Sequence, residues 1–283
     1  MRKQQFIYKT WKELLLKVSF FPATATEAKD KTILYFHGGG FLFGDREDLP
    51  EAYLALFLKN GFHVLAFDYP LAPETPLREI VHCLEAGVHW FSENYQSRLN
   101  LLEPGFFLFG RSAGGCLASI LTANHYQHQL GLIRFYGYHH FDHEEFVLPS
   151  PFYNHYPKVP PLTAQQLIQN QPTVVSGVAE RFPLYLSARQ YGNWLSYLGP
   201  KLNELTVNDK QLEQFPPVFM AHCRKDPDVP IVSSQQMAAA VKQCTFLELD
   251  RIEHDFDREK NPTATDIYQK LLDWLEEHIR NRK

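Results

Sequence analysis

The 283-residue chain has few cysteines, no excess of basic residues and no long apolar run. Its four cysteines lie far apart and form no CxxC pair, which suits reduced thiols in a cytoplasmic protein. The formal net charge is −4 and no basic stripe with interleaved aromatic residues occurs, so nucleic acid is not expected as a partner. No apolar run approaches the roughly 20 residues that span a bilayer, so stable membrane insertion is not expected either.

The first 25 residues could be misread as a secretory leader, because basic residues precede an apolar stretch and a small-residue segment. Glu13 and Lys17 interrupt that stretch, however. Its apolar residues also alternate with period two, namely Leu14, Leu16, Val18 and Phe20. We therefore predict a half-buried strand that ends at Pro22, and not a signal peptide.

Strands and helices alternate along most of the chain, which is typical of a mostly parallel sheet flanked by helices. We predict strands near 32–36, 62–67, 106–109, 130–136, 217–221 and 245–249. We predict helices over 50–60, from 76, from 116, over 233–242 and from 262. Between residues 138 and 207 this alternation is lost in a stretch rich in proline, tyrosine, histidine and asparagine. The pattern predicts an α/β catalytic core, residues 1–137 and 208–283, with residues 138–207 inserted as a cap or lid.

A serine stands at a sharp turn between a predicted strand and a predicted helix, in the segment Gly110-Arg111-Ser112-Ala113-Gly114-Gly115. Side chains at the flanking glycines would collide with the neighbouring strand and helix. The arrangement is that of a nucleophile elbow, in which the serine hydroxyl is exposed above the sheet. Ser112 is therefore the candidate nucleophile.

A serine nucleophile needs an imidazole to take its proton and a carboxylate to orient that imidazole. Asp226 follows the predicted strand at 217–221, and His254 follows the last predicted strand. The order Ser112, Asp226, His254 is that of α/β-hydrolases. Asp228 is the rival acid; we prefer Asp226, which is nearer the strand, and interpret Asp228 as a turn or helix-cap residue.

A glycine-rich turn directly after the strand at 32–36 offers an oxyanion site. Backbone N–H groups of Gly38 and Gly39, together with that of Ala113, would stabilise the negative charge of a tetrahedral intermediate. His37 and Gly40 would support this loop, with His37 holding it by hydrogen bonding. No Gly-Lys-Ser/Thr follows the turn and no third glycine completes a dinucleotide fingerprint, so a nucleotide loop is not predicted.

These segments together resemble the hormone-sensitive lipase-like esterase family of α/β-hydrolases. The matching residues are His37-Gly38-Gly39-Gly40-Phe41, Asp68-Tyr69-Pro70-Leu71-Ala72-Pro73-Glu74, the Ser112 elbow, Asp226 and His254. The resemblance implies a serine carboxylesterase that acts on short- to medium-chain or acetyl esters through an acyl-enzyme, without metal or organic cofactor. It departs from the family at Arg111, where the family usually has an acidic residue, and in its short segment before His37. The chain therefore reads as a divergent member, whose substrate preference cannot be transferred.

Alternatives remain on the same triad. An amidase or peptidase, or a deacetylase of polysaccharide or phenolic esters, would use the same three residues, and a non-catalytic binding protein of this fold is a distant alternative. The sequence neither predicts nor excludes a homodimer. An imidazole base also predicts that activity falls below roughly pH 6.

Several other residues receive structural interpretations. His139, His140 and His143 resemble a metal cluster but lack a carboxylate at familiar ligand spacing, so metal binding is not predicted. Asp68 and Glu74 are interpreted as turn-stabilising, and His222 as a core histidine.

Overall fold

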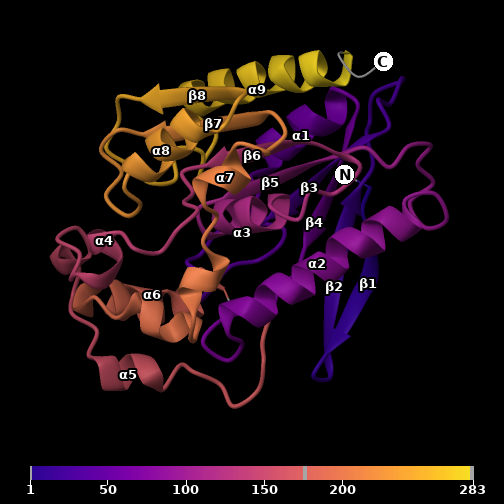
Figure 1. The fold of residues 1–283 in the computed structure, drawn as a ribbon. Coiled ribbons are helices and arrows are strands. Elements are labelled where there is room, and N and C mark those ends of the chain that lie inside the picture. Colours follow the sequence, from indigo (N-terminus) through magenta and orange to yellow (C-terminus); the bar gives the residue numbers. More distant parts are fainter. Residues whose placement is uncertain (1, 175–176, 281–283) are drawn as a thin grey trace.

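The centre of the molecule is a twisted β-sheet, which has eight strands in the part of the chain that the structure describes. The structure is a computed structural model and describes residues 2–174 and 177–280. The strand order is β1-β2-β4-β3-β5-β6-β7-β8 (Figure 1). The strands are β1 (Gln4–Trp11), β2 (Leu14–Phe21), β3 (Lys31–Phe36), β4 (Phe62–Phe67), β5 (Phe106–Arg111), β6 (Gln129–Phe135), β7 (Val218–Cys223) and β8 (Cys244–Leu249).

The direction of the strands decides where the candidate residues meet. β1 and β2 form an antiparallel hairpin, and β2 is antiparallel to β4. The strands from β4 through β3, β5, β6 and β7 to β8 pair in parallel. Parallel strands have their carboxyl ends at one edge of the sheet, so the segments that follow β3, β5, β7 and β8 lie at the same edge.

Helices cover both faces of this sheet (Figure 1). Successive residues of β3 point to opposite faces: Leu34 and Phe36 join one apolar cluster, and Ile33 and Tyr35 join the other. The first cluster includes α2 (Leu77–Asn94), α3 (Ala113–Thr122) and α8 (Val232–Ala240). The second includes α1 (Glu51–Lys59) and α9 (Pro262–Arg280). Burial on both faces explains why the central strands are almost continuously apolar.

The predicted mostly parallel sheet with flanking helices is confirmed, and so is the strand that ends at Pro22, which is β2. One long helix was not predicted. α6 (Val178–Tyr191) lies within the stretch where no regular pattern was recognised, and it contains Pro183 in its interior. Proline removes one backbone hydrogen bond from a helix, so α6 has to be stabilised by its tertiary contacts.

Residues between β6 and β7 form a separate group of short elements. They include α4 (Glu144–Val147), α5 (Pro161–Gln165), α6, α7 (Asp209–Leu212) and the short 3-10 turns at Tyr153–His155, Trp194–Leu198 and Leu202–Leu205. In Figure 1, α4, α5 and α6 lie together at the lower left, outside the two helix layers. Apart from α7, which falls in the predicted core segment 208–283, this group corresponds to the predicted insertion at 138–207, whose role as a cap stays a prediction.

A buried ion pair attaches the insertion to the core. The Arg181 guanidinium of α6 donates two hydrogen bonds to Glu74, from Nη1 to Oε1 at 2.7 Å and from Nη2 to Oε2 at 2.8 Å. Nη2 also donates to the Ala72 carbonyl at 2.8 Å. Both side chains are only 2% exposed. Glu74 therefore does more than stabilise its own turn, because it ties that turn to α6.

No helix among the described residues is long and apolar enough to cross a membrane.

The Glu74–Arg181 pair allows a stability test. Arg181→Met should lower the free energy of unfolding by about 3–5 kcal/mol, because it leaves the Glu74 carboxylate buried without its counter-charge. Arg78→Met is the matched control: its partner is Glu204, both side chains are at least 40% exposed, and its loss should cost less than about 1 kcal/mol. Urea unfolding measures both values. Equal losses in the two variants would contradict the anchoring role of the buried pair.

Candidate active site

Ser112 lies at the turn between β5 and α3 with a strained backbone, φ 53° and ψ −120°. Close packing forces this shape. A Cβ on Gly110 would lie 1.9 Å from the Gly114 carbonyl oxygen, and a Cβ on Gly114 would lie 2.1 Å from the Phe36 carbonyl oxygen. Only glycine fits at both positions, and the elbow holds the serine in a conformation that few residues adopt without support.

The three candidate triad residues form one chain of hydrogen bonds. Ser112 Oγ is 2.8 Å from His254 Nε2, and His254 Nδ1 is 2.7 Å from Asp226 Oδ2. Ser112 follows β5, Asp226 follows β7 and His254 follows β8, so the parallel sheet brings them together from positions up to 142 residues apart. Nδ1–H donates to the carboxylate, which leaves Nε2 free to accept the serine proton.

Asp226 is held by donors on both oxygens. Oδ1 accepts from the backbone N–H groups of Asp228 at 2.8 Å and Val229 at 2.9 Å. Oδ2 accepts from His254 and also from His222, whose Nε2 lies 3.0 Å away. Burial would raise the pKa of Asp226, but His254 and His222 together lower it well below its usual value.

His222 has a role beyond filling the core. Its Nε2 faces two acceptors, Asp226 Oδ2 and the Val229 carbonyl, while Nδ1 faces the Ser234 hydroxyl at 2.7 Å. Nε2 therefore carries the proton and donates it. Burial lowers the pKa of His222, which keeps the ring neutral. Sequence reasoning missed this contact; the one available signal was the i,i+4 spacing from His222 to Asp226.

The protonation of His254 differs from the sequence-based expectation. Burial by itself would lower the pKa of His254, but the nearby Asp226 carboxylate, with smaller contributions from Asp228 and Asp255, raises it from 6.5 to about 9. The base therefore binds its proton well above the pH of 6 that an ordinary imidazole predicts.

The predicted oxyanion residues lie beside Ser112. A Cβ on Gly38 would be 3.4 Å from the Ser112 Cβ, and Gly38 and Gly39 line the same cavity as the serine. Ala113 is the first residue of α3, where backbone N–H groups have no partner within the helix. His37 stacks on Tyr69 with ring centroids 4.1 Å apart, and its Nδ1 is 2.8 Å from the Gly38 carbonyl oxygen. These contacts hold the His37–Gly38 segment in place, and its role in supporting an oxyanion loop stays a prediction.

A cavity of about 460 Å³ opens above these groups. The core contributes the glycine-rich loop at 38–40, Ser112, His254 and the segment around Asp228. The insertion contributes a largely aromatic wall, consisting of Phe152, Tyr153, Tyr156, Phe182 and Tyr185. Apolar walls with a few polar groups at one end are typical of small-molecule sites.

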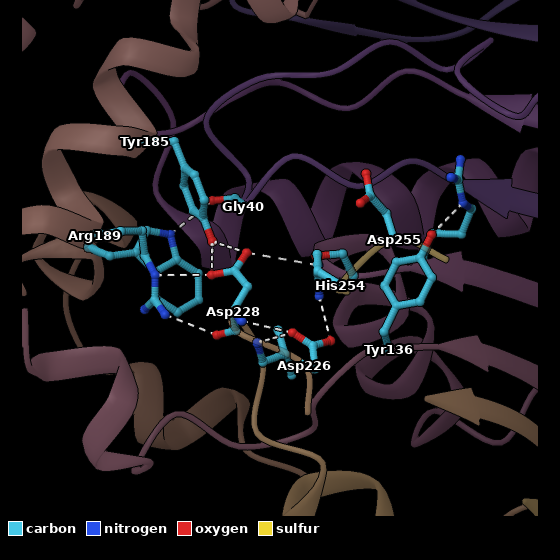
Figure 2. A network of polar contacts seen from close by, with 12 residues as sticks. Gly40, Tyr136, Tyr185, Arg189, Asp226, Asp228, His254 and Asp255 are labelled. Atoms are coloured by element: carbon cyan, nitrogen blue, oxygen red, sulfur yellow. Dashed lines mark hydrogen bonds and ion pairs between the residues drawn. The ribbon is translucent and has the colours of Figure 1, made fainter. Parts of the chain in front are cut away.

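Asp228 lies in the turn after β7, as predicted, but its side chain is not a helix cap. Its side chain is 4% exposed and pairs with two residues of α6: the Tyr185 hydroxyl lies 2.8 and 2.7 Å from its two oxygens, and Arg189 Nε lies 3.1 Å from Oδ1. α8, the next helix, has no side-chain cap. Asp228 Oδ2 also lies 3.9 Å from His254 Nε2, whereas Asp226 contacts the other ring nitrogen, Nδ1 (Figure 2).

Arg111 is buried, and the Asp257 carboxylate balances its positive charge. It donates from Nη2 to Asp257 Oδ1 at 3.1 Å, from Nε to the Tyr136 hydroxyl at 2.8 Å and from Nη1 to the Tyr35 hydroxyl at 3.2 Å. Asp257 stands three residues after His254, and the Tyr136 ring packs edge-on against the His254 ring at 4.8 Å. Arg111 therefore stabilises the loop that carries His254.

The histidine cluster does not form a metal site within residues 2–174 and 177–280. There, no group of three or more histidine, cysteine, aspartate or glutamate side chains is arranged to hold a metal ion. His140 instead contacts the Asp142 carboxylate and Gln236.

Two curated relatives match about a third of this chain in sequence. It is similar to Lipase 2 of Moraxella sp., at 36% identity over 93 residues, which are 33% of this chain and 21% of that protein. It is similar to the acetyl esterase of Salmonella typhi, at 33% identity over 88 residues, which are 31% of this chain and 27% of that protein. Both matches span less than a third of the relative's length.

The structural similarity extends over nearly the whole chain. A protein of unknown function from Staphylococcus aureus subsp. aureus Mu50 superimposes with a TM-score of 0.88 at 28% identity, covering 98% of this chain and 99% of that one. The sequence profile of the family described as alpha/beta hydrolase fold matches residues 33–258, which include the glycine-rich loop at 38–40, Ser112, Asp226 and His254. The family match covers most of the chain, and the sheet and elbow have the expected form, so this protein belongs to the α/β-hydrolase fold family.

Proposed function

We propose that this protein is a serine carboxylesterase. Ser112 would be the nucleophile, His254 the general base and acid, and Asp226 the carboxylate that orients the imidazole. The observation that carries the proposal is the continuous chain of hydrogen bonds from Ser112 Oγ through His254 to Asp226, at the floor of a cavity. The names of the lipase and acetyl esterase relatives support ester hydrolysis as the reaction class.

The first half of the reaction acylates the serine. His254 Nε2 takes the Ser112 proton while Oγ forms a bond to the ester carbonyl carbon, and the carbonyl oxygen becomes an oxyanion. The N–H groups of Gly38, Gly39 and Ala113 donate to that oxygen. His254 then gives its proton to the alkoxy oxygen as the carbonyl carbon–oxygen bond breaks, and the free alcohol leaves.

The second half releases the acid by the same route. His254 takes a proton from water, whose oxygen attacks the acyl carbon, and the imidazolium returns that proton to Ser112 Oγ as the acyl bond breaks. The Asp226 carboxylate stays ionised throughout and stabilises the imidazolium. No step requires a metal or an organic cofactor.

The size and walls of the cavity support small substrates. About 460 Å³ suits a short- to medium-chain acyl group or an acetyl group with its alcohol. We propose that the insertion at 138–207 acts as the cap of this site, since its aromatic residues form one wall.

The four cysteines are free, with Cys83, Cys116 and Cys223 buried, which supports the expectation of a reducing, cytoplasmic compartment.

The assignment of Ser112 has a direct test. Ser112→Ala should lower kcat for p-nitrophenyl butyrate by about 10⁴-fold or more and abolish labelling by a fluorophosphonate, because no other group can form the acyl-enzyme. Ser92→Ala is the control, because the Ser92 hydroxyl only donates to the Val88 carbonyl within α2. This variant should retain both turnover and labelling. Circular dichroism checks folding. Turnover by a folded Ser112→Ala variant close to that of the parent would remove the proposal.

The raised pKa of His254 sets the pH dependence. The base works only when neutral, so kcat/KM for an uncharged ester should fall as the pH drops through about 9. The stability contribution has the opposite sense: a pKa raised by folding stabilises the protein below the unfolded value near 6.5, and this contribution is lost as the pH rises through about 9. Initial rates between pH 6 and 10.5 measure the profile, after the rate of the Ser112→Ala variant at each pH is subtracted as background hydrolysis. A plateau that extends down to pH 7 would contradict the shift.

A further inference from the structure

Two carboxylates flank the ring of His254, and the proposed reaction uses only one of them. Asp226 contacts Nδ1, whereas Asp228 Oδ2 lies 3.9 Å from Nε2 (Figure 2). Asp228 lines the cavity although its side chain is only 4% exposed. A substrate whose reacting group faces His254 Nε2 would therefore lie close to this carboxylate.

α6 holds Asp228 in this position. The Tyr185 hydroxyl has one proton, so it donates to one carboxylate oxygen at a time, and Arg189 supplies the counter-charge next to Oδ1. Arg189 is fixed in turn, because Nη2 donates to the Asp228 carbonyl at 2.9 Å and Nη1 to the Glu145 carbonyl at 3.0 Å. The Tyr153 hydroxyl is a further hydrogen-bonding partner of this carboxylate. A carboxylate offers about four acceptor positions, so these three partners leave capacity for one more donor, and Oδ2 faces His254.

The chemistry of the leaving group determines what meets this oxygen. In the proposed mechanism His254 Nε2 protonates the alkoxy oxygen of the ester, so that oxygen lies within hydrogen-bond distance of Nε2. Asp228 Oδ2 is 3.9 Å from the same nitrogen. A hydroxyl on the carbon next to the alkoxy carbon could therefore donate to Oδ2 while the alkoxy oxygen faces Nε2.

We propose that Asp228 is a specificity-determining residue that accepts a hydrogen bond from a second hydroxyl of the alcohol, so that the preferred substrates are esters of diols and polyols. The inference rests on the proposed esterase function and names its alcohol class. Arg189 neutralises the Asp228 charge, which favours a neutral hydroxyl over an ammonium group as the donor. The aromatic wall from the insertion would contact the carbon skeleton of such an alcohol.

A pair of matched esters isolates this contact. 2-Hydroxyethyl butyrate and propyl butyrate share their acyl group and nearly their shape, and differ in a terminal hydroxyl against a methyl. The wild-type kcat/KM should favour the hydroxyethyl ester by roughly tenfold or more, as expected for a hydrogen bond to a charged acceptor. Effects of Asp228 on the pKa of His254 act on both esters alike and cancel in this ratio.

Substitutions assign the preference to Asp228. Asp228→Asn should bring the ratio close to one, because it removes the charge and half of the acceptor capacity. Where Asp228→Asn does not fold because Arg189 is left unpaired, the double variant Asp228→Asn with Arg189→Met removes both charges and should give the same ratio. Asp45→Asn is the matched control, since Asp45 lines the same cavity but makes no contact with His254 in the described part of the chain, and it should keep the wild-type ratio.

The outcomes separate this inference from the proposed function. A wild-type ratio near one, or a tenfold preference that survives in the Asp228 variants, overturns the role of Asp228. A stronger preference for 2-(dimethylamino)ethyl butyrate, which is cationic at pH 7, would show recognition of charge and overturn the hydroxyl assignment. If the wild-type protein is not labelled by a fluorophosphonate and hydrolyses none of these esters, the proposed esterase function itself is rejected.

Discussion

The geometry of the site depends on the hydrogen bonds that the buried Asp226 carboxylate accepts. Its Oδ1 closes the turn after β7 through the N–H groups of Asp228 and Val229, and its Oδ2 receives His222 and His254. A buried carboxylate without these donors would be costly, so the turn, the imidazole and the acid are fixed together. The same turn directs the Asp228 side chain toward the other nitrogen of His254. One carboxylate thus determines the position of both acidic groups around the base.

Arg111 shows how a reversed charge can be accommodated next to a nucleophile. A buried guanidinium requires a partner, and Asp257 supplies it from the loop that also carries His254. Tyr136 donates to the same Asp257 oxygen and packs against the imidazole, while Tyr268 donates to the second oxygen. The guanidinium hydrogen bonds are directed to these neighbours. The departure from the family motif therefore acts on the position of the base, and adds little free positive charge to the cavity.

The sequence predicted the core well because local patterns determine it. Apolar strands, helix faces such as that of α2, and glycines that permit close backbone approach are all visible without knowing the fold. Ser112, Asp226 and His254 could be proposed together because each follows a strand, and the parallel sheet brings these strand ends within hydrogen-bond distance. α6 was missed because an interior proline and a weak apolar periodicity conceal it. The turn position of Asp228 was predicted, but its side-chain contacts were not, because its partners Tyr185 and Arg189 lie 43 and 39 residues away in that same helix.

α6 and the turn that follows it contact both the glycine-rich loop at 38–40 and the Asp228 side chain beside His254, so the proposed cap would do more than cover the site. Tyr185 packs closely on Gly40, where an added Cβ would lie 2.3 Å from its ring, and Trp194 donates to the Gly40 carbonyl at 3.1 Å. The same Tyr185 hydroxyl contacts Asp228 beside His254 (Figure 2). A change in α6 would therefore move the loop proposed to hold the oxyanion and the carboxylate nearest the leaving group at the same time. Because the walls that select a substrate also position these groups, specificity and rate are physically coupled in this arrangement.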